Sequence, residues 1–163
     1  MSLEIRPAGP QDELLLFRLA HDRFFEELRA DLWPEVFREP LLKMQVEGQR
    51  TAYAAAFPHA DHGIIMLYGR PVGRLLIDRG PAVHHIVDIL LAKEHRSKGV
   101  GTAILRALCT EADLLRKPVR LFVGTGNRAT ALYQRLGFQL IETIPDRWLM
   151  ERPPVAVGAS IGG

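Results

Sequence analysis

Residues 88–105 constrain the fold of this chain more than any other stretch. They begin with the uncharged apolar run 89–92, which is typical of a buried β-strand. A basic turn with two glycines follows at residues 96–101. The chain then enters a helical pattern with apolar residues on one face: Ile104, Leu105, Leu108, Cys109, Ala112 and Leu115. A strand, a glycine turn and a helix in direct succession predict a ligand site where the helix begins.

The turn itself has the composition of an anion site. The first N–H groups of a helix lack intrahelical partners, and the helix dipole is positive there. Gly99 and Gly101 let a ligand approach the backbone, and Arg96 and Lys98 add two cationic side chains. We therefore expect the ligand to carry phosphate.

Two common phosphate-binding motifs do not fit this turn. The chain contains no GxxxxGK[ST] sequence of the Walker A type. The dinucleotide fingerprint GxGxxG fails at its third glycine, where Ile104 stands, and no acidic residue closes a second strand about 20 residues on. A protein that binds a nucleotide phosphate through this turn is therefore the weaker alternative.

Composition excludes several other classes. At 163 residues, with 47% hydrophobic and 25% charged residues, the chain is expected to form one globular domain. The net charge of +2 is small and the basic residues are spread along the chain, so no nucleic-acid partner is expected. No apolar run approaches the length of a membrane span, and the N-terminus lacks an apolar leader. The single cysteine, Cys109, allows no intrachain disulfide and favours a reducing, cytoplasmic location.

Periodicity along the chain predicts alternating strands and helices. We expect strands over 3–7, 64–68, 72–78, 83–92, 119–123, 138–144 and 147–151, and helices over 11–28, 40–57, 100–116 and 128–136. Pro40 is placed in the first turn of its helix. The order β-α-α-β-β-β-α-β-α-β-β predicts an α/β (α+β) fold with a mixed, mostly antiparallel twisted sheet and helices on both faces. We expect one domain over 1–151 and a flexible tail over 152–163.

Two segments resemble a known family. R-x-x-G-x-G at residues 96–101 is similar to the pyrophosphate loop of the GNAT superfamily of acyl-CoA-dependent N-acyltransferases. Asn127 followed by LYQRLGF at residues 132–138 resembles the N…LYxxxGF segment that completes the acyl-CoA site in this superfamily. The element order is also that of the GNAT fold. The resemblance implies a small N-acetyltransferase that moves an acetyl group from acetyl-CoA to a primary amine by direct attack in a ternary complex.

The resemblance also implies which residues bind acetyl-CoA. Pantetheine is expected to pair with the backbone of Ile89, Leu90 and Leu91, and the Leu91 N–H to meet the thioester oxygen. The pyrophosphate is expected on the turn and the helix start, at Arg96, Ser97, Lys98, Gly99, Val100, Gly101 and Thr102. Asn127 and Tyr133 complete the set, although an asparagine before a helix is equally typical of an N-cap.

Three residues are candidates for proton transfer. Tyr133 is expected to protonate the departing thiolate. A lone helical tyrosine more often packs in a core, but the surrounding LYxxxGF favours catalysis. Asp88 and His85 are candidate general bases, with a relay of water molecules as the alternative. Because neighbouring residues on a strand point to opposite faces, His84 and His85 do not predict a metal site.

The acceptor is expected to be a small-molecule or peptide amine. In the family, acceptor contacts usually come from the first two helices and the loop between them, where Gln45, Gln49 and Tyr53 form a row at intervals of four. Trp33, in the aromatic-rich segment before the second helix, can cover an apolar acceptor pocket or simply pack. The same row can be a solvated face without a ligand. A GNAT-fold sensor that binds acyl-CoA without turnover is the alternative function, and the sequence leaves open whether the protein is a monomer or a homodimer.

Overall fold

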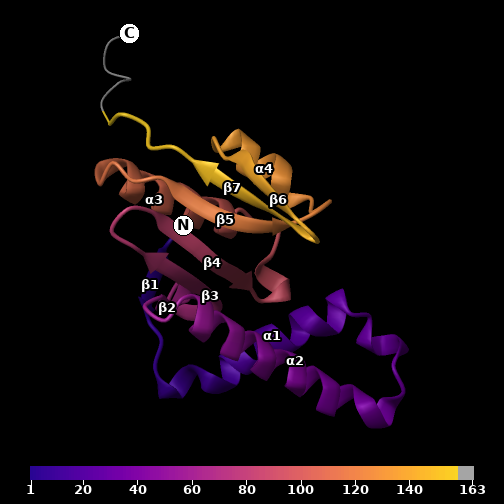
Figure 1. The fold of residues 1–163 in the computed structure, drawn as a ribbon. Helices are drawn as coiled ribbons and strands as arrows, with labels where there is room; N and C mark the ends of the chain where they lie inside the picture. The colour runs from indigo at the N-terminus through magenta and orange to yellow at the C-terminus, as the bar shows by residue number, and fades with distance from the viewer. Residues whose placement is uncertain (158–163) are drawn as a thin grey trace. The chain divides into compact units, whose positions relative to one another are not determined.

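A computed structural model describes residues 1–157 of the chain (Figure 1). Seven strands, four α-helices and three short 3-10 helices (η) follow one another in the described part. Their bounds are β1 Leu3–Pro7, η1 Pro10–Asp12, α1 Glu13–Glu27, η2 Ala30–Leu32, α2 Glu35–Ala56, β2 Asp61–Leu67, β3 Arg70–Arg79, β4 His84–Leu91, η3 Lys93–His95, α3 Val100–Leu114, β5 Val119–Gly124, α4 Ala129–Arg135, β6 Gln139–Ile144 and β7 Arg147–Arg152. The predicted order of strands and helices is confirmed.

The strands form one mixed sheet in the order β1-β2-β3-β4-β5-β7-β6. Antiparallel pairing joins β1 to β2, β5 to β7 and β7 to β6. β4 and β5 are parallel, and α3 is the crossover that a parallel pair requires. Their register joins residues 84–86 of β4 to 119–121 of β5. The predicted mostly antiparallel, mixed α/β fold is therefore confirmed.

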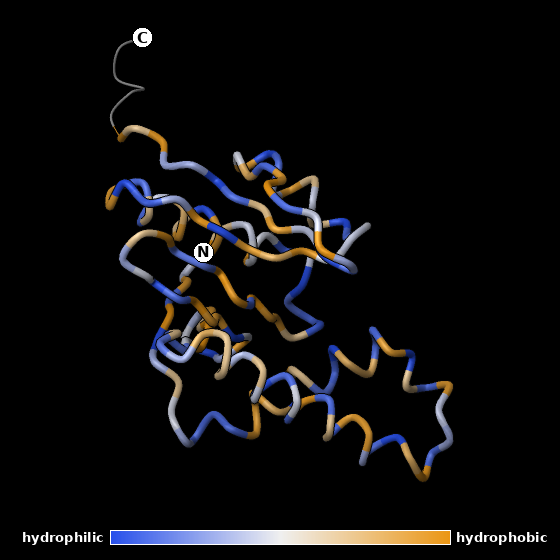
Figure 2. Tube along the Cα trace, in the orientation of Figure 1, coloured by the Kyte–Doolittle hydropathy of each residue, from blue (hydrophilic) through white to orange (hydrophobic). Residues whose placement is uncertain are grey.

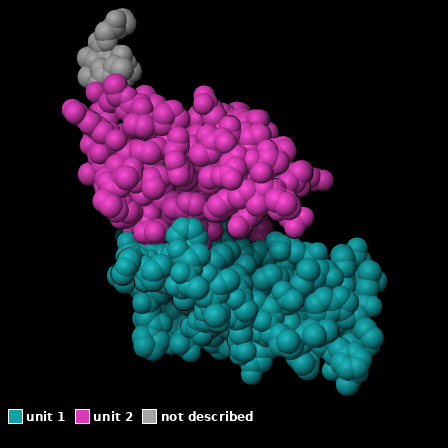
Figure 3. Space-filling view, viewed as in Figure 1, with its two compact units in different colours: residues 1–76, 88–95 teal, residues 77–87, 96–163 magenta. Residues whose placement is uncertain are grey.

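The chain divides into two compact units, coloured separately in Figure 3. The first unit comprises Met1–Leu76 and Asp88–His95, and the second comprises Ile77–Val87 and the residues from Arg96 onward. β4 therefore contributes residues to both units. The expectation of one domain over 1–151 stays a prediction, and residues 158–163 of the expected tail lie outside the described part.

In the first unit, α1 and α2 lie side by side (Figure 1). The core of this unit contains Leu42 of α2 and Ile64 of β2, both fully buried. α2 begins at Glu35, so the prediction that Pro40 lies in the first turn of its helix is wrong: Pro40 lies inside α2. Proline there removes the hydrogen bond to the carbonyl of Val36. Val36 is 74% exposed, so water can reach this part of the helix and satisfy that carbonyl.

In the second unit, α3 buries the predicted apolar face, and Figure 2 shows the matching orange segments. Five of the six predicted residues are buried: Ile104, Leu105, Leu108, Cys109 and Ala112. The prediction for Leu115 is wrong, because α3 ends at Leu114 and leaves Leu115 53% exposed. Arg116 has a φ of 56°, a left-handed conformation that does not continue a helix.

An ion pair fixes the end of β7 within the second unit. Both guanidinium Nη atoms of Arg152 donate to the Asp113 carboxylate of α3, at 2.8 and 3.0 Å. Its Nε donates to the Leu136 carbonyl at 2.8 Å, and the Val155 N–H donates to Asp113 at 2.9 Å. The prediction that the flexible tail begins at Arg152 is therefore wrong: Arg152 belongs to β7 and its side chain is only 11% exposed.

Candidate active site

The glycine turn of the second unit begins α3 in the way an anion site requires. Gly99 is the N-cap residue, with a φ of 84°, and no side chain caps the helix. The Ala103 N–H donates to the Gly99 carbonyl at 3.0 Å, as the first bond of the helix. The N–H groups of Val100, Gly101 and Thr102 therefore have no intrahelical partner.

The space beside this turn is open. A Cβ atom built on Gly99 would meet no atom within 4 Å. Ser97, Lys98 and Gly99 are exposed, and Arg96 is half-buried. Three N–H groups and two cationic residues thus belong to one short segment, which can bind a phosphate group through charge-assisted hydrogen bonds.

α4 carries the second predicted segment, also in the second unit. The Asn127 side-chain oxygen accepts from the Ala129 N–H at 2.8 Å, so the capping role considered for Asn127 is present. The half-buried Tyr133 ring meets the Phe138 ring edge-on, with centroids 5.8 Å apart and an interplanar angle of 62°. Because Phe138 is only 2% exposed, it gives the Tyr133 ring a fixed support.

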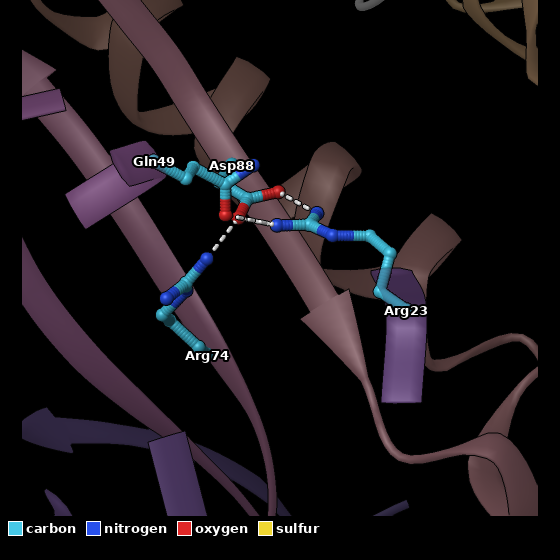
Figure 4. A network of polar contacts seen from close by, with 4 residues as sticks. All are labelled: Arg23, Gln49, Arg74 and Asp88. Atoms are coloured by element: carbon cyan, nitrogen blue, oxygen red, sulfur yellow. Dashed lines mark hydrogen bonds and ion pairs between the residues drawn. The ribbon is translucent and has the colours of Figure 1, made fainter. Parts of the chain in front are cut away.

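Asp88 lies in the first unit at the centre of a polar network (Figure 4). Arg23 of α1 donates to both carboxylate oxygens, at 2.8 and 2.9 Å. Arg74 of β3 donates to Oδ2, and Arg23 also donates to the side-chain oxygen of Gln49 of α2 at 2.9 Å. We call Arg23, Gln49, Arg74 and Asp88 the Asp88 cluster. It joins two helices and two strands through side chains that are mostly withdrawn from water.

The two arginines determine the charge of Asp88. Burial alone would raise the pKa of this carboxyl group, but the hydrogen bonds and charge of Arg23, and then the charge of Arg74, outweigh burial. The pKa of Asp88 is therefore below its ordinary value, and the group is ionised at neutral pH. A carboxylate held in this way is a weak proton acceptor. The role of Asp88 as general base stays a prediction, and these contacts count against it.

His85, the other candidate base, lies in the second unit. Its ring packs against Phe122 of β5, with centroids 5.3 Å apart, and the Arg147 guanidinium lies 4.1 Å from the centre of the same Phe122 ring. Burial is the main cause that lowers the pKa of His85. The charge of Asp78 acts against burial, and the charges of Arg120 and Arg147 act with it. His85 is therefore neutral at pH 7 and has a nitrogen lone pair that can accept a proton.

Of the predicted acceptor row, the structure brings two members to the Asp88 cluster. Gln49 is part of it, and Tyr53 interacts electrostatically with Asp88, Arg23 and Arg74. The pKa of Tyr53 is raised, first by burial and then by the charge of Asp88. Gln45 is exposed, and Trp33 is half-buried after η2, where its carbonyl accepts from Arg38 at 3.3 Å. The roles of all four residues toward an acceptor stay predictions.

Sequence reasoning missed the two arginines of the Asp88 cluster. Arg74 had a detectable signal, because it stands in the otherwise apolar interior of a predicted strand, VGRLLI, where an unpaired charge is costly. Arg23 had none, because it follows Asp22 in a helix with other charged residues. Their shared partner was visible only after the chain had folded.

Within residues 1–157, no group of three His, Cys, Asp or Glu side chains is arranged to hold a metal ion. No helix in that range combines the length and apolar character that crossing a membrane requires.

The sequence and the structure are similar to those of known proteins. Residues 21–138 match the acetyltransferase (GNAT) family, whereas no curated protein matches the sequence. Among solved structures, PaiA N-acetyltransferase from Thermoplasma acidophilum, in complex with coenzyme A, is 18% identical, with a TM-score of 0.68 over 94% of this chain and 99% of that chain. An acetyltransferase from Thermus thermophilus is 22% identical, with a TM-score of 0.66 over 94% and 97%. The ribosomal-protein-S18-alanine N-acetyltransferase from Escherichia coli is 16% identical, with a TM-score of 0.64 over 98% of both chains. At these identities the structural likeness shows a shared fold.

Proposed function

Because the chain belongs to the GNAT acetyltransferase family, we propose that it transfers an acetyl group from acetyl-CoA to a primary amine by direct attack in a ternary complex. The observation that carries the proposal is the open N-terminus of α3, where Gly99 leaves three N–H groups without intrahelical partners beside Arg96 and Lys98. This segment lies inside the part of the chain that matches the family.

The cofactor contacts follow from the chemistry of the segment. Acetyl-CoA supplies the acetyl thioester. The N–H groups of residues 100–102 and the Arg96 and Lys98 side chains are proposed to bind its pyrophosphate. The Leu91 N–H is proposed to donate to the thioester carbonyl oxygen, which gains negative charge as the amine attacks. Neighbouring Ile89 and Leu90, together with Ser97 and Asn127, are the remaining proposed contacts.

Proton transfer needs one donor and one acceptor. As the amine nitrogen bonds to the carbonyl carbon, the C–S bond breaks, and the sulfur takes a proton that the Tyr133 hydroxyl is proposed to donate. A phenol is ordinarily protonated at neutral pH. The amine loses a proton, and His85 is better suited than Asp88 to accept it, because His85 is neutral and Asp88 is held by two arginines.

Replacement of Tyr133 by phenylalanine tests the proposal. Tyr133→Phe keeps the ring that packs on Phe138 and removes only the hydroxyl oxygen. Acetyl-CoA should still raise Tm, whereas kcat should fall about 100-fold or more if protonation limits the rate. Tyr68→Phe is the matched control, because Tyr68 is 69% exposed. It should leave kcat unchanged.

Two outcomes would contradict parts of the proposal. If Tyr133→Phe lowers Tm and cofactor affinity but leaves kcat unchanged, Tyr133 is a packing residue. If acetyl-CoA raises Tm but no amine in a broad panel releases free thiol, the protein is an acyl-CoA sensor. The cytoplasm is the proposed location, since acetyl-CoA is an intracellular metabolite and the single cysteine suits a reducing compartment.

A further inference from the structure

The Asp88 cluster carries one positive charge more than its negative charge. Arg23 and Arg74 are cationic, Asp88 is anionic, and Gln49 is neutral. Tyr53, which faces the cluster, is also neutral because its pKa is raised by burial and then by Asp88. The imbalance lies among side chains with low exposure: 8% for Asp88, 13% for Arg74 and 17% for Arg23.

Arg74 is the source of the imbalance. Arg23 and Asp88 form a two-pronged, charge-neutral pair at 2.8 and 2.9 Å, and Gln49 accepts a further hydrogen bond from Arg23. Arg74 donates to Oδ2 of Asp88, an oxygen that Arg23 already uses. Its Nε is buried and has no hydrogen-bond partner in the described part of the chain. A buried donor without a partner is costly and requires an explanation.

The Asp88 cluster and its surroundings contain two further neutral donors. Gln49 directs its side-chain oxygen to Arg23, which leaves its amide NH2 group as a donor, and Tyr53 has its hydroxyl group. The pKa of His62 is lowered, first by burial and then by the charges of Arg74 and Arg50, which together outweigh the opposite effect of Asp61. A partner for Arg74 should therefore be an anion that accepts hydrogen bonds.

The position of the cluster suits the acceptor of the proposed reaction. Asp88 stands three residues before Leu91 on β4, and both belong to the first unit. At a rise of about 3.3 Å per residue, the two backbone positions are about 10 Å apart. The Asp88 cluster is thus attached to the same strand as the backbone N–H assigned to the thioester, three residues before it.

From the surplus charge and unpartnered Nε of Arg74, we propose that the acceptor is an amine that also carries a carboxylate, and that this carboxylate binds Arg74 with help from Gln49 and Tyr53. The inference rests on the proposed acetyl transfer. It places amino acids, or peptides with a nearby acidic group, ahead of neutral amines and polyamines, since the surplus positive charge repels a second cationic group.

A length series of matched acceptors tests the inference. Each ω-amino acid from glycine to 6-aminohexanoate is compared with its carboxamide by the release of free thiol from acetyl-CoA. For the best length, kcat/KM should favour the acid by about 10- to 150-fold, the range of a charge-assisted hydrogen bond. Arg74→Gln should reduce this ratio to about 1–2. Arg70→Gln is the matched control, because Arg70 is exposed at the start of the same strand, and it should keep the wild-type ratio.

A binding measurement on the wild-type protein covers the case in which Arg74→Gln does not fold. Calorimetry with the N-acetylated product of the best acid and that of its amide should show at least tenfold tighter binding of the acid. Equal affinities would overturn the inference, as would an unchanged kcat/KM ratio in a folded Arg74→Gln protein. Failure of acetyl transfer itself appears differently, as an absence of thiol release with every amine tested.

Discussion

Asp88→Asn separates a structural role of Asp88 from a role as general base. The substitution keeps the size of the side chain but removes the charge that Arg23 and Arg74 share. These arginines are only 17% and 13% exposed, so water cannot fully replace the lost carboxylate. Breaking a buried pair of this kind costs about 3–5 kcal/mol. For a chain of this length, the corresponding fall in Tm is about 6–20 °C.

Denaturant unfolding at several pH values provides the assay. Because the pKa of Asp88 is lowered in the folded protein, its contribution to stability is fully present above the unfolded pKa near 3.9. The contribution is lost as the pH falls through the lower, folded pKa. The difference between wild type and Asp88→Asn should therefore be constant from about pH 5 to 8 and shrink below about pH 4.

A matched control is Asp22→Asn on α1. Asp22 is 68% exposed and makes a 3.3 Å contact with His21, so its replacement should change stability by less than about 1 kcal/mol. A loss below about 1 kcal/mol in Asp88→Asn as well, or a difference that persists at low pH, would refute the electrostatic account of the Asp88 cluster. Normal stability with a 10²- to 10⁴-fold loss of kcat would instead identify Asp88 as the base.

Three other predictions concern the second unit. Gly99→Val should abolish the rise in Tm with acetyl-CoA, because the valine side chain enters the open space beside the turn and strains a φ of 84°. The control Gly48→Val, on the exposed face of α2, should keep the rise in Tm. An equal rise in both variants would refute the assignment of the turn. Deletion of residues 153–163 should cost less than about 1.5 kcal/mol in chemical denaturation, because among the described residues it removes one hydrogen bond, from Val155 to Asp113. A larger loss would show that this segment stabilises the fold. If His85 is the base, kcat/KM should fall toward acidic pH with a midpoint below about 6.5, since the pKa of His85 is lowered. His85→Ala should remove this pH dependence and lower kcat/KM by about 10²- to 10⁴-fold. A loss under about tenfold would favour a relay of water molecules.

The features that sequence predicted well are those set by neighbouring residues. The turn before α3 and the buried face of α3 depend on glycine positions and on a helical repeat, both of which are local. The preference of proline for the first turn predicts a helix that begins at Pro40, whereas α2 begins at Glu35 and water reaches the exposed Val36 beside Pro40. Local rules describe Pro40 as a helix start, while the fold tolerates it inside an exposed helix.

The Asp88 cluster shows where sequence reasoning stops. Asp88 and Arg23 are 65 positions apart, and Asp88 and Arg74 are 14 apart, so no periodicity connects them. The sequence identified Asp88 as a titratable group near the expected site, but its pKa depends on the two guanidinium groups that folding brings to it. Residue type and strand position therefore make Asp88 a candidate base, whereas its two arginine partners make it a weak proton acceptor.

The strand order in the second unit has a consequence for synthesis on the ribosome. β7 follows β6 in the chain but lies between β5 and β6 in the sheet. Until β7 has left the exit tunnel, β5 lacks its antiparallel neighbour and β6 has no strand to join. During that interval Leu140 and Ile141 of β6, which are 50% and 45% exposed even in the finished fold, belong to an unpaired apolar segment. Chains that are truncated before Arg147 and released should therefore be more prone to aggregation than chains that include all of β7.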